Sequence, residues 1–252
     1  MTNRRPEMVR LRHKQPRQRR ASRINPAPRD MMKTVVEEIC AEHGLPTDLQ
    51  ITISIPGGEE IAKQTWNPRL GIKGGLSILG TTGIVRPFSC SAWIASIHRG
   101  VDVARADGLA HVAGCTGAMS EKAVQALYGL PDHAMLDMGD FAGGMLKYLA
   151  KNPVPRITVG GGIGKMTKLA QGAVDLHSSR SQVDFDVLAS MMDDPRLAAA
   201  NTMLEAYEIA GEKLASCVAD RALERLRTGF GSEMTFDVVM IDRAGTILAR
   251  AG

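Results

Sequence analysis

Residues 56–87 concentrate the backbone and side chains most suited to binding a ligand. Seven glycines fall within these 32 residues, interleaved with charged and amide side chains. So many glycines weaken any helix or strand and let the backbone turn close to a bulky group. Thr81 and Thr82 add hydroxyls suited to carboxylates or phosphate, although a plain turn explains them equally well. The candidate binding residues here are Gly57, Gly58, Glu59, Lys63, Asn67, Arg69, Thr81 and Thr82.

A second glycine-rich run, Gly160–Lys165, follows a predicted strand and precedes a helical pattern. Backbone N–H groups at such a turn can bind an anion, and the helix N-terminus adds a favourable dipole. The run departs from the Walker A pattern at Val159 and Met166 and does not match G-x-G-x-x-G, so a tight turn without a ligand is the alternative. Its candidate residues are Gly160, Gly161, Gly162, Gly164 and Lys165.

Acidic residues follow the apolar run 134–138, where the sequence predicts the carboxyl end of a strand. Asp137, Gly139 and Asp140 lie there, and open α/β sheets bind ligands beyond the carboxyl ends of their strands. A solvated cap for a helix beginning near Phe141 is the alternative interpretation. We therefore take these three residues as candidates for binding a cofactor.

His177 is the remaining candidate, and we expect it at the C-terminal end of the helix that follows Gly160. A histidine there gains from the helix dipole, which is a sufficient structural reason for its presence. The functional alternative is an imidazole that faces a ligand near Gly160–Lys165. The six His and four Cys show neither metal-ligand spacing nor a Ser/His/Asp or Cys/His order, so we expect no metal site.

The net charge of +4 conceals a strong segregation. Residues 1–23 hold nine basic side chains and one acidic side chain, whereas the other 229 residues hold 22 basic and 26 acidic ones. The high pI therefore belongs to the tail and is no evidence that the folded body binds nucleic acid. Aromatic residues at 4% also count against a stacking platform for single strands.

Composition otherwise indicates an ordinary globular protein. A hydrophobic share of 44% with 23% charged residues excludes a wholly disordered or collagen-like chain. No apolar run approaches the roughly 18–20 residues that span a bilayer, so we expect no membrane association. The four cysteines are scattered and no secretory segment precedes them, which predicts reduced thiols in the cytoplasm.

Apolar periodicity predicts an α/β alternation after residue 89. Trp93, Ile94, Ile97 and Val101 form one face of the first helix. We expect helices at 29–43, from 89, at 120–129 with Ser120 as its cap, at 141–151, through 176, at 182–192 and at 197–227. We expect strands at 50–55, 109–113, 134–138 and 156–159, and a terminal hairpin of 235–242 and 246–250.

Several long motifs resemble the CbiD family over roughly residues 24–250. The runs are ISIPGGEEIAK at 53–63, NPRLGI at 67–72 and GLSILGTTGIV at 75–85, with INPAPR at 24–29, GKMTKLA at 164–170 and HS at 177–178. Family members normally begin with a further segment that carries T-T-G-x-C-A-x-A, and residues 1–23 resemble nothing in it. Some members have Ser-Asn where Gly139 and Asp140 stand, which bears on any polar role of Asp140.

The resemblance implies an enzyme, a C-methyltransferase that moves a methyl group from S-adenosylmethionine to C1 of cobalt-precorrin-5B. Cobalt would then arrive with this tetrapyrrole, which carries eight carboxylates. Arg69 and Lys63 would meet carboxylates, because Arg pairs them bidentately. On this interpretation Lys165 and His177 also bind the tetrapyrrole, while Asp137, Gly139, Asp140 and the glycines of 160–164 bind S-adenosylmethionine.

The predicted fold class is α/β, with a truncated α+β first domain and a parallel-sheet α/β domain with helices on both faces. We expect a basic disordered tail at 1–23, the partial first domain at 24–88, the α/β domain at 89–230 and a C-terminal hairpin at 231–252. An unpaired edge on the strand at 50–55 would make the chain poorly soluble or oligomeric. A non-catalytic corrinoid-binding remnant and a basic-tail nucleic-acid binder are the alternative functions.

Overall fold

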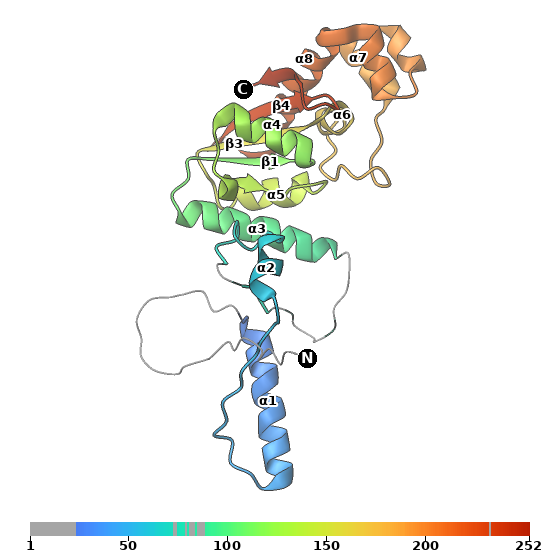
Figure 1. Cartoon of the computed structure of the whole chain (residues 1–252). Coiled ribbons are helices and arrows are strands. Elements are labelled where there is room, and N and C mark those ends of the chain that lie inside the picture. Colours follow the sequence, from blue (N-terminus) through green and yellow to red (C-terminus); the bar gives the residue numbers. More distant parts are fainter. Residues whose placement is uncertain (1–23, 73–74, 79, 81–83, 85–88, 232) are drawn as a thin grey trace, which may run out of the picture. The chain divides into compact units, whose positions relative to one another are not determined.

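The computed structural model describes residues 24–72, 75–78, 80, 84, 89–231 and 233–252. The chain divides into two compact units, Met1–Ser89 and Cys90–Gly252 (Figure 1). Among the described residues, no helix is both long and apolar enough to cross a lipid bilayer.

The first unit contains two helices among its described residues, α1 (Pro26–His43) and α2 (Gly58–Lys63). Helix α1 has a proline in its first turn and ends at Gly44, which adopts the left-handed conformation that glycine tolerates best. The predicted helix at 29–43 is thereby confirmed. Ile24 forms a parallel bridge to Ile78, which ties the residues before α1 to the glycine-rich segment.

The predicted strand at 50–55 is wrong. Among the described residues of this segment only Ile53 forms an isolated bridge, and the rest of the segment has no ladder pairing. Alternating isoleucines favour a strand, but a strand also needs a neighbour that supplies backbone hydrogen bonds. The unpaired edge that led us to expect poor solubility is therefore not present in the described residues.

The second unit is built on a five-stranded sheet in the order β2-β1-β3-β4-β5. Its strands are β1 (His111–Cys115), β2 (Met135–Leu136), β3 (Arg156–Gly162), β4 (Thr235–Ile241) and β5 (Ile247–Ala251). The first four pair in parallel, and β5 returns antiparallel to β4. The predicted α/β alternation and the terminal hairpin are confirmed, and the hairpin completes the same sheet.

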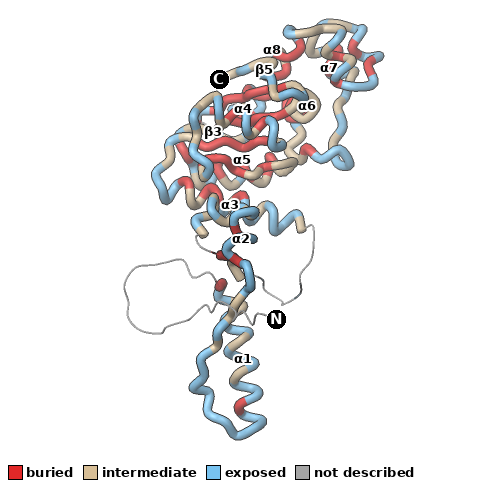
Figure 2. Tube along the Cα trace, viewed as in Figure 1, coloured by how far each residue is buried: buried red, intermediate tan, exposed pale blue. Residues whose placement is uncertain are grey.

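Helices cover both faces of this sheet (Figures 1 and 2). They are α3 (Cys90–Ala106), α4 (Ala118–Tyr128), α5 (Ala142–Leu149), α6 (Ile163–Ala170), α7 (Phe185–Met192) and α8 (Met203–Phe230), with short 3₁₀ turns at Asp132–Ala134 and Pro195–Ala199. The residues buried on one face come from α3, α5, α6 and α8, whereas α4 covers the other face. The predicted α/β class is confirmed by this layering.

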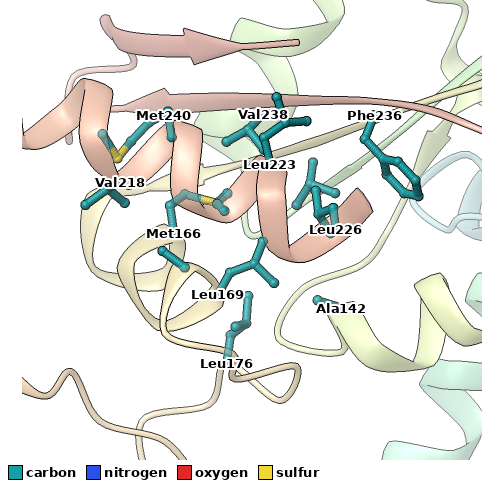
Figure 3. Packing of buried hydrophobic residues seen from close by; sticks show 14 of the residues in the cluster. Ala142, Met166, Leu169, Leu176, Val218, Leu223, Leu226, Phe236, Val238 and Met240 are labelled. Carbon is teal, nitrogen blue, oxygen red and sulfur yellow. The ribbon is translucent and has the colours of Figure 1, made fainter. Parts of the chain in front are cut away.

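Strand β4 shows how alternation divides the core. Phe236, Val238 and Met240 pack on the face that α8 covers (Figure 3), while Val239 and Ile241 join the α4 cluster. Burying both sides of a parallel strand is what makes its sequence a nearly continuous apolar run.

Two expected details of the helices are wrong. Helix α4 begins after Gly117, and the hydroxyl of Ser120 donates to the Gly117 carbonyl at 2.8 Å from inside the first turn. The pattern at 197–227 divides into the turn Pro195–Ala199 and α8, whose N-terminus is capped by Thr202. A capping hydroxyl and a mid-turn hydroxyl are alike in sequence, and only the backbone distinguishes them.

Candidate functional site

The strand order places a topological switch point at the carboxyl ends of β1 and β3. The chain moves from β1 to its neighbour β2 on one side, and then returns to β3 on the other side of β1. The connections after β1 and β3 therefore leave in opposite directions, and open α/β sheets bind ligands at such a switch point. The N–H of Thr116 donates to the Gly160 carbonyl at 2.9 Å and extends the pairing of β1 and β3 beyond the end of β1.

An ion pair joins the segments that follow β2 and β3. Lys165 Nζ lies 2.7 Å from Asp140 Oδ1 and donates to the Thr116 carbonyl at 3.2 Å. The N–H of Gly139 donates to the Cys115 carbonyl at 3.1 Å. The ends of β1, β2 and β3 are thus connected through one lysine and one aspartate. Four residues of this site are half-buried and reach the surface, namely Thr116, Gly139, Asp140 and Lys165.

The expected anion-binding loop at Gly160–Gly164 is wrong in its conformation. Gly160, Gly161 and Gly162 extend β3 and pair in register with β4, so their backbone groups belong to the sheet. A Cβ on Gly160 would lie 2.7 Å from Val124, and one on Gly161 would lie 2.8 Å from Thr116. Close packing against α4 and the β1 turn therefore explains the first two glycines.

Asp140 does not cap the helix that follows it. The residue before α5 is Phe141, and no side chain caps that end. The carbonyl of Asp140 instead accepts the N–H of Leu176 at 2.9 Å. This bond brings the segment after α6 to the ion pair, although more than thirty positions separate the two in sequence.

His177 lies in that segment and not at a helix end, because α6 ends at Ala170. The helix-dipole explanation of His177 is therefore wrong. Its Nδ1 lies 2.7 Å from Ser179 Oγ, and Asp175 pairs with Arg180 at 2.6 Å to hold the turn. The exposed imidazole consequently belongs to an ordered loop next to Asp140.

Asp137 has an aromatic neighbour on the helix that follows the first unit. The indole Nε1 of Trp93, in the first turn of α3, donates to the Asp137 carbonyl at 2.7 Å. Trp93 remains 44% exposed, whereas Ile97 and Val101 of the same predicted helix face are buried. Thr116 was also missed, although Gly114 and Gly117 mark a tight turn between an expected strand and an expected helix.

The candidates of the first unit lie around α2. Gly57 precedes the helix in the left-handed conformation, and Gly58 packs against Ile55. Glu59 is exposed in the first turn, and Lys63 pairs with Glu60 at 2.6 Å on the surface. These residues share one short helix and its entry turn.

Asn67 and Arg69 follow α2. The Asn67 amide donates to the Gly75 carbonyl at 3.3 Å and so holds the glycine-rich segment. The Arg69 guanidinium lies 4.2 Å from the centre of the Trp66 ring, a cation–π contact that orients it. Thr81 and Thr82 lie outside the described residues.

A buried polar cluster lies at the opposite, amino ends of the strands. Asp237 accepts from Arg156 Nη2 at 2.9 Å and from the Thr158 hydroxyl at 3.2 Å, and His111 Nε2 lies 2.8 Å from that hydroxyl. Burial lowers the pKa of His111 and the Arg156 charge lowers it further, while Asp237 acts against them. The cluster joins β1, β3 and β4, and its polar side chains bind one another.

Over the described ranges no group of three or more His, Cys, Asp or Glu is placed to hold a metal ion.

Comparison with known proteins identifies relatives along most of the sequence. The family model described as CbiD matches residues 17–87, and that described as CbiD, C-terminal domain, matches residues 175–252. Proteins of Brucella anthropi, Brucella canis and Brucella abortus, each named cobalt-precorrin-5B C(1)-methyltransferase, are 58% identical over 239 residues. The match covers 90% of this chain, which spans 65% of the length of these relatives.

A crystal structure of a cobalamin biosynthesis protein, cbiD, from Archaeoglobus fulgidus also matches, with 18% identity and a TM-score of 0.23 over 73% of this chain and 52% of that one. The two family models together cover more than half of the sequence, and the curated relatives extend the similarity through the residues between the two matches. The motifs at 53–85 and 164–178 are therefore those of a family, and this chain belongs to the CbiD family.

Proposed function

We propose that this chain takes part in transferring a methyl group from S-adenosylmethionine to C1 of cobalt-precorrin-5B. The observation that carries the proposal is the cluster of Thr116, Asp140 and Lys165 at the switch point of the sheet. It occurs in a chain 58% identical to proteins named for this reaction. Their name supplies the substrate and the reaction class, and the cluster supplies a place for the methyl donor.

The residues around the switch point suit an adenosyl group. Asp137 follows the β1–α4 turn by about 20 residues, the spacing at which dinucleotide-binding folds place the acid that binds a ribose. Asp140 offers a second carboxylate at the same strand end, and the absence of a Cβ on Gly139 lets the Trp93 ring approach that segment. The donor assignment thus rests on Asp137, Gly139, Asp140 and Gly164, and no longer on the three glycines within β3.

S-adenosylmethionine supplies a methyl group on a sulfonium, so the transfer demands alignment more than acid–base catalysis. Fixing two reactants in line replaces a bimolecular encounter by a positioned one. The chain's contribution is therefore to orient. The ion pair of Lys165 and Asp140 joins the two segments that would flank the donor, and the Thr116 carbonyl accepts a hydrogen bond from the lysine.

The tetrapyrrole brings carboxylates and its own cobalt, and it needs cations and hydroxyls around its rim. In the first unit we assign Arg69 and Lys63 to its carboxylates. Within the second unit, taken by itself, Lys165 and His177 are the candidates. The Lys63–Glu60 pair is exposed and contributes little to stability, so a carboxylate can replace Glu60 at small cost. Thr81 and Thr82 remain candidates for further hydroxyl contacts.

The compartment we expect for this chain is the cytoplasm, where cysteine thiols stay reduced.

Calorimetric titration of the two ligands separately tests the assignment. Arg69→Ala should weaken cobalt-precorrin-5B binding by roughly 1.5–3 kcal/mol, the range for a hydrogen bond to a charged group, and leave S-adenosylmethionine binding unchanged. Arg29→Ala, an exposed arginine in α1, is the matched control and should change neither. Loss of S-adenosylmethionine binding in the Arg69 variant, with the tetrapyrrole still bound, would reverse the two assignments.

Activity needs a second measurement, because binding alone does not separate an enzyme from a binding protein. Radiolabelled S-adenosylmethionine should label cobalt-precorrin-5B, and the metal-free ring serves as the competing substrate. Tight binding of both ligands with no label transferred would favour a corrinoid-binding protein over a methyltransferase.

A further inference from the structure

We propose that Trp93 is the aromatic wall of the donor site and stacks on the adenine of S-adenosylmethionine. The inference rests on the proposed function, and it adds a specificity-determining residue that belongs to neither glycine-rich motif. Trp93 shares one face of its helix with Ile94, Ile97 and Val101 in the sequence pattern, yet 44% of the residue is exposed. A large indole left open at a strand end is a surface on which a flat ligand can rest.

Three contacts fix the ring in place. Its Nε1 donates to the Asp137 carbonyl at 2.7 Å, and its ring lies 5.8 Å from that of Phe141 in an edge arrangement. Its Cζ2 approaches Gly139 so closely that a Cβ there would lie 3.1 Å away. Gly139 has a φ of +53°, which glycine tolerates best. The indole is therefore oriented before any ligand arrives, and this reduces the entropy that binding costs.

The position of the ring relative to the carboxylates suggests which part of the ligand it meets. Trp93 contacts the segment that carries Asp137 and Asp140, immediately beyond β2. Strand β2 is at the edge of the sheet, with β1 between it and β3. A ribose held by these carboxylates, with its methionine chain toward the switch point between β1 and β3, would direct its base toward the β2 edge. Trp93 is the side chain that lies there.

Stacking predicts a preference for the adenosyl part of the ligand. Stacking of one base on an aromatic side chain contributes enough that removing the ring should weaken binding tenfold or more. Trp93→Leu keeps apolar bulk without the aromatic face, whereas Trp93→Phe keeps a smaller ring without the indole N–H. The phenylalanine variant should therefore bind several-fold better than the leucine variant.

The chain's two tryptophans make Trp93 an optical reporter once the other is replaced. In the full chain carrying Trp66→Phe, the emission comes from Trp93 alone. S-adenosylhomocysteine and adenosine should quench this emission with saturation, and methionine at the same concentration should not. Thermal melting of each Trp93 variant without ligand separates loss of stacking from loss of folding.

Calorimetry run alongside keeps the two proposals distinguishable. If S-adenosylhomocysteine binds while Trp93 emission stays constant and Trp93→Leu binds equally well, the donor does not rest on the indole and the role of Trp93 is overturned. If the folded chain binds neither S-adenosylhomocysteine nor S-adenosylmethionine, the donor site itself is overturned and the role of Trp93 with it. Quenching together with a tenfold weaker Trp93→Leu variant supports both.

Discussion

Lys165 Nζ lies 2.7 Å from Asp140 Oδ1, and this contact joins the helix after β3 to the segment after β2. The lysine side chain is 38% exposed and the aspartate 23%. A partly exposed pair of this kind contributes about 1 kcal/mol or less to the free energy of unfolding. Its main consequence is geometric, because it keeps an ammonium group at the switch point of the sheet.

Replacing that ammonium should affect ligand binding far more than folding. Lys165→Met should weaken binding of cobalt-precorrin-5B about tenfold, since a hydrogen bond to a charged group contributes roughly 1.5–3 kcal/mol. Its thermal midpoint should stay close to that of the native chain. Lys151→Met is the control, because Lys151 is exposed and lies before the amino end of β3, away from the switch point. Equal weakening by both variants would show that overall charge, and not the position of Lys165, attracts the ligand.

The two glycines at the ends of the 160–162 run should respond differently to alanine. A Cβ on Gly160 would meet Val124 at 2.7 Å and Cys115 at 3.0 Å, whereas nothing lies within 4 Å of one on Gly162. Gly160→Ala should lower the free energy of unfolding by roughly 1–3 kcal/mol through overpacking. Gly162→Ala should change it by less than about 1 kcal/mol. Urea denaturation measures both, and a neutral Gly160→Ala variant would argue against the packing of α4 on β3.

His111 should make the fold sensitive to mild acid. Its pKa is lowered in the folded chain, chiefly by burial, below the value near 6.5 of an unfolded histidine. Protonation therefore opposes folding. The stability that neutral His111 contributes is fully present above about pH 6.5 and is lost as the pH falls toward the folded-state pKa. His111→Gln should flatten the fall in thermal midpoint on that acid side. His43→Gln, at an exposed histidine of α1, should leave it unchanged.

Thiol reactivity should separate the cysteines of the second unit. Burial, together with the smaller effect of the Glu121 charge, raises the pKa of Cys115 to about 12. Cys90 is exposed at the start of α3. Because the thiolate is the reactive form, iodoacetamide at about pH 8 should modify Cys90 first and Cys115 only after unfolding. Peptide mass spectrometry measures the order, and Cys90→Ser should remove the fast phase. Early modification of Cys115 would mean that the α4 face opens readily.

The sequence by itself was enough to predict several helices and strands. Pro26 and Gly44 bracket α1, and the apolar runs near 111, 156 and 235 become strands because both of their faces are buried. The run at 50–55 carries a comparable alternation and fails, because hydrogen bonds from a neighbouring strand decide whether such a segment forms a ladder. The family motifs at 53–85 and 164–178 were likewise readable without a structure.

Tertiary structure alone decided which candidate residues meet. Asp140 and Lys165 are far apart in sequence, and they meet because β2 and β3 both flank β1. Leu176, the residue before His177, reaches the same place by binding the Asp140 carbonyl. Gly160–Gly162 resembled an anion loop, yet their register with β4 places them inside the sheet. Trp93 matched the apolar face of a helix, yet it contacts Gly139 and the Asp137 carbonyl beyond β2 and remains 44% exposed. Periodicity reports which face of an element is apolar, whereas strand order and side-chain packing determine what that face contacts.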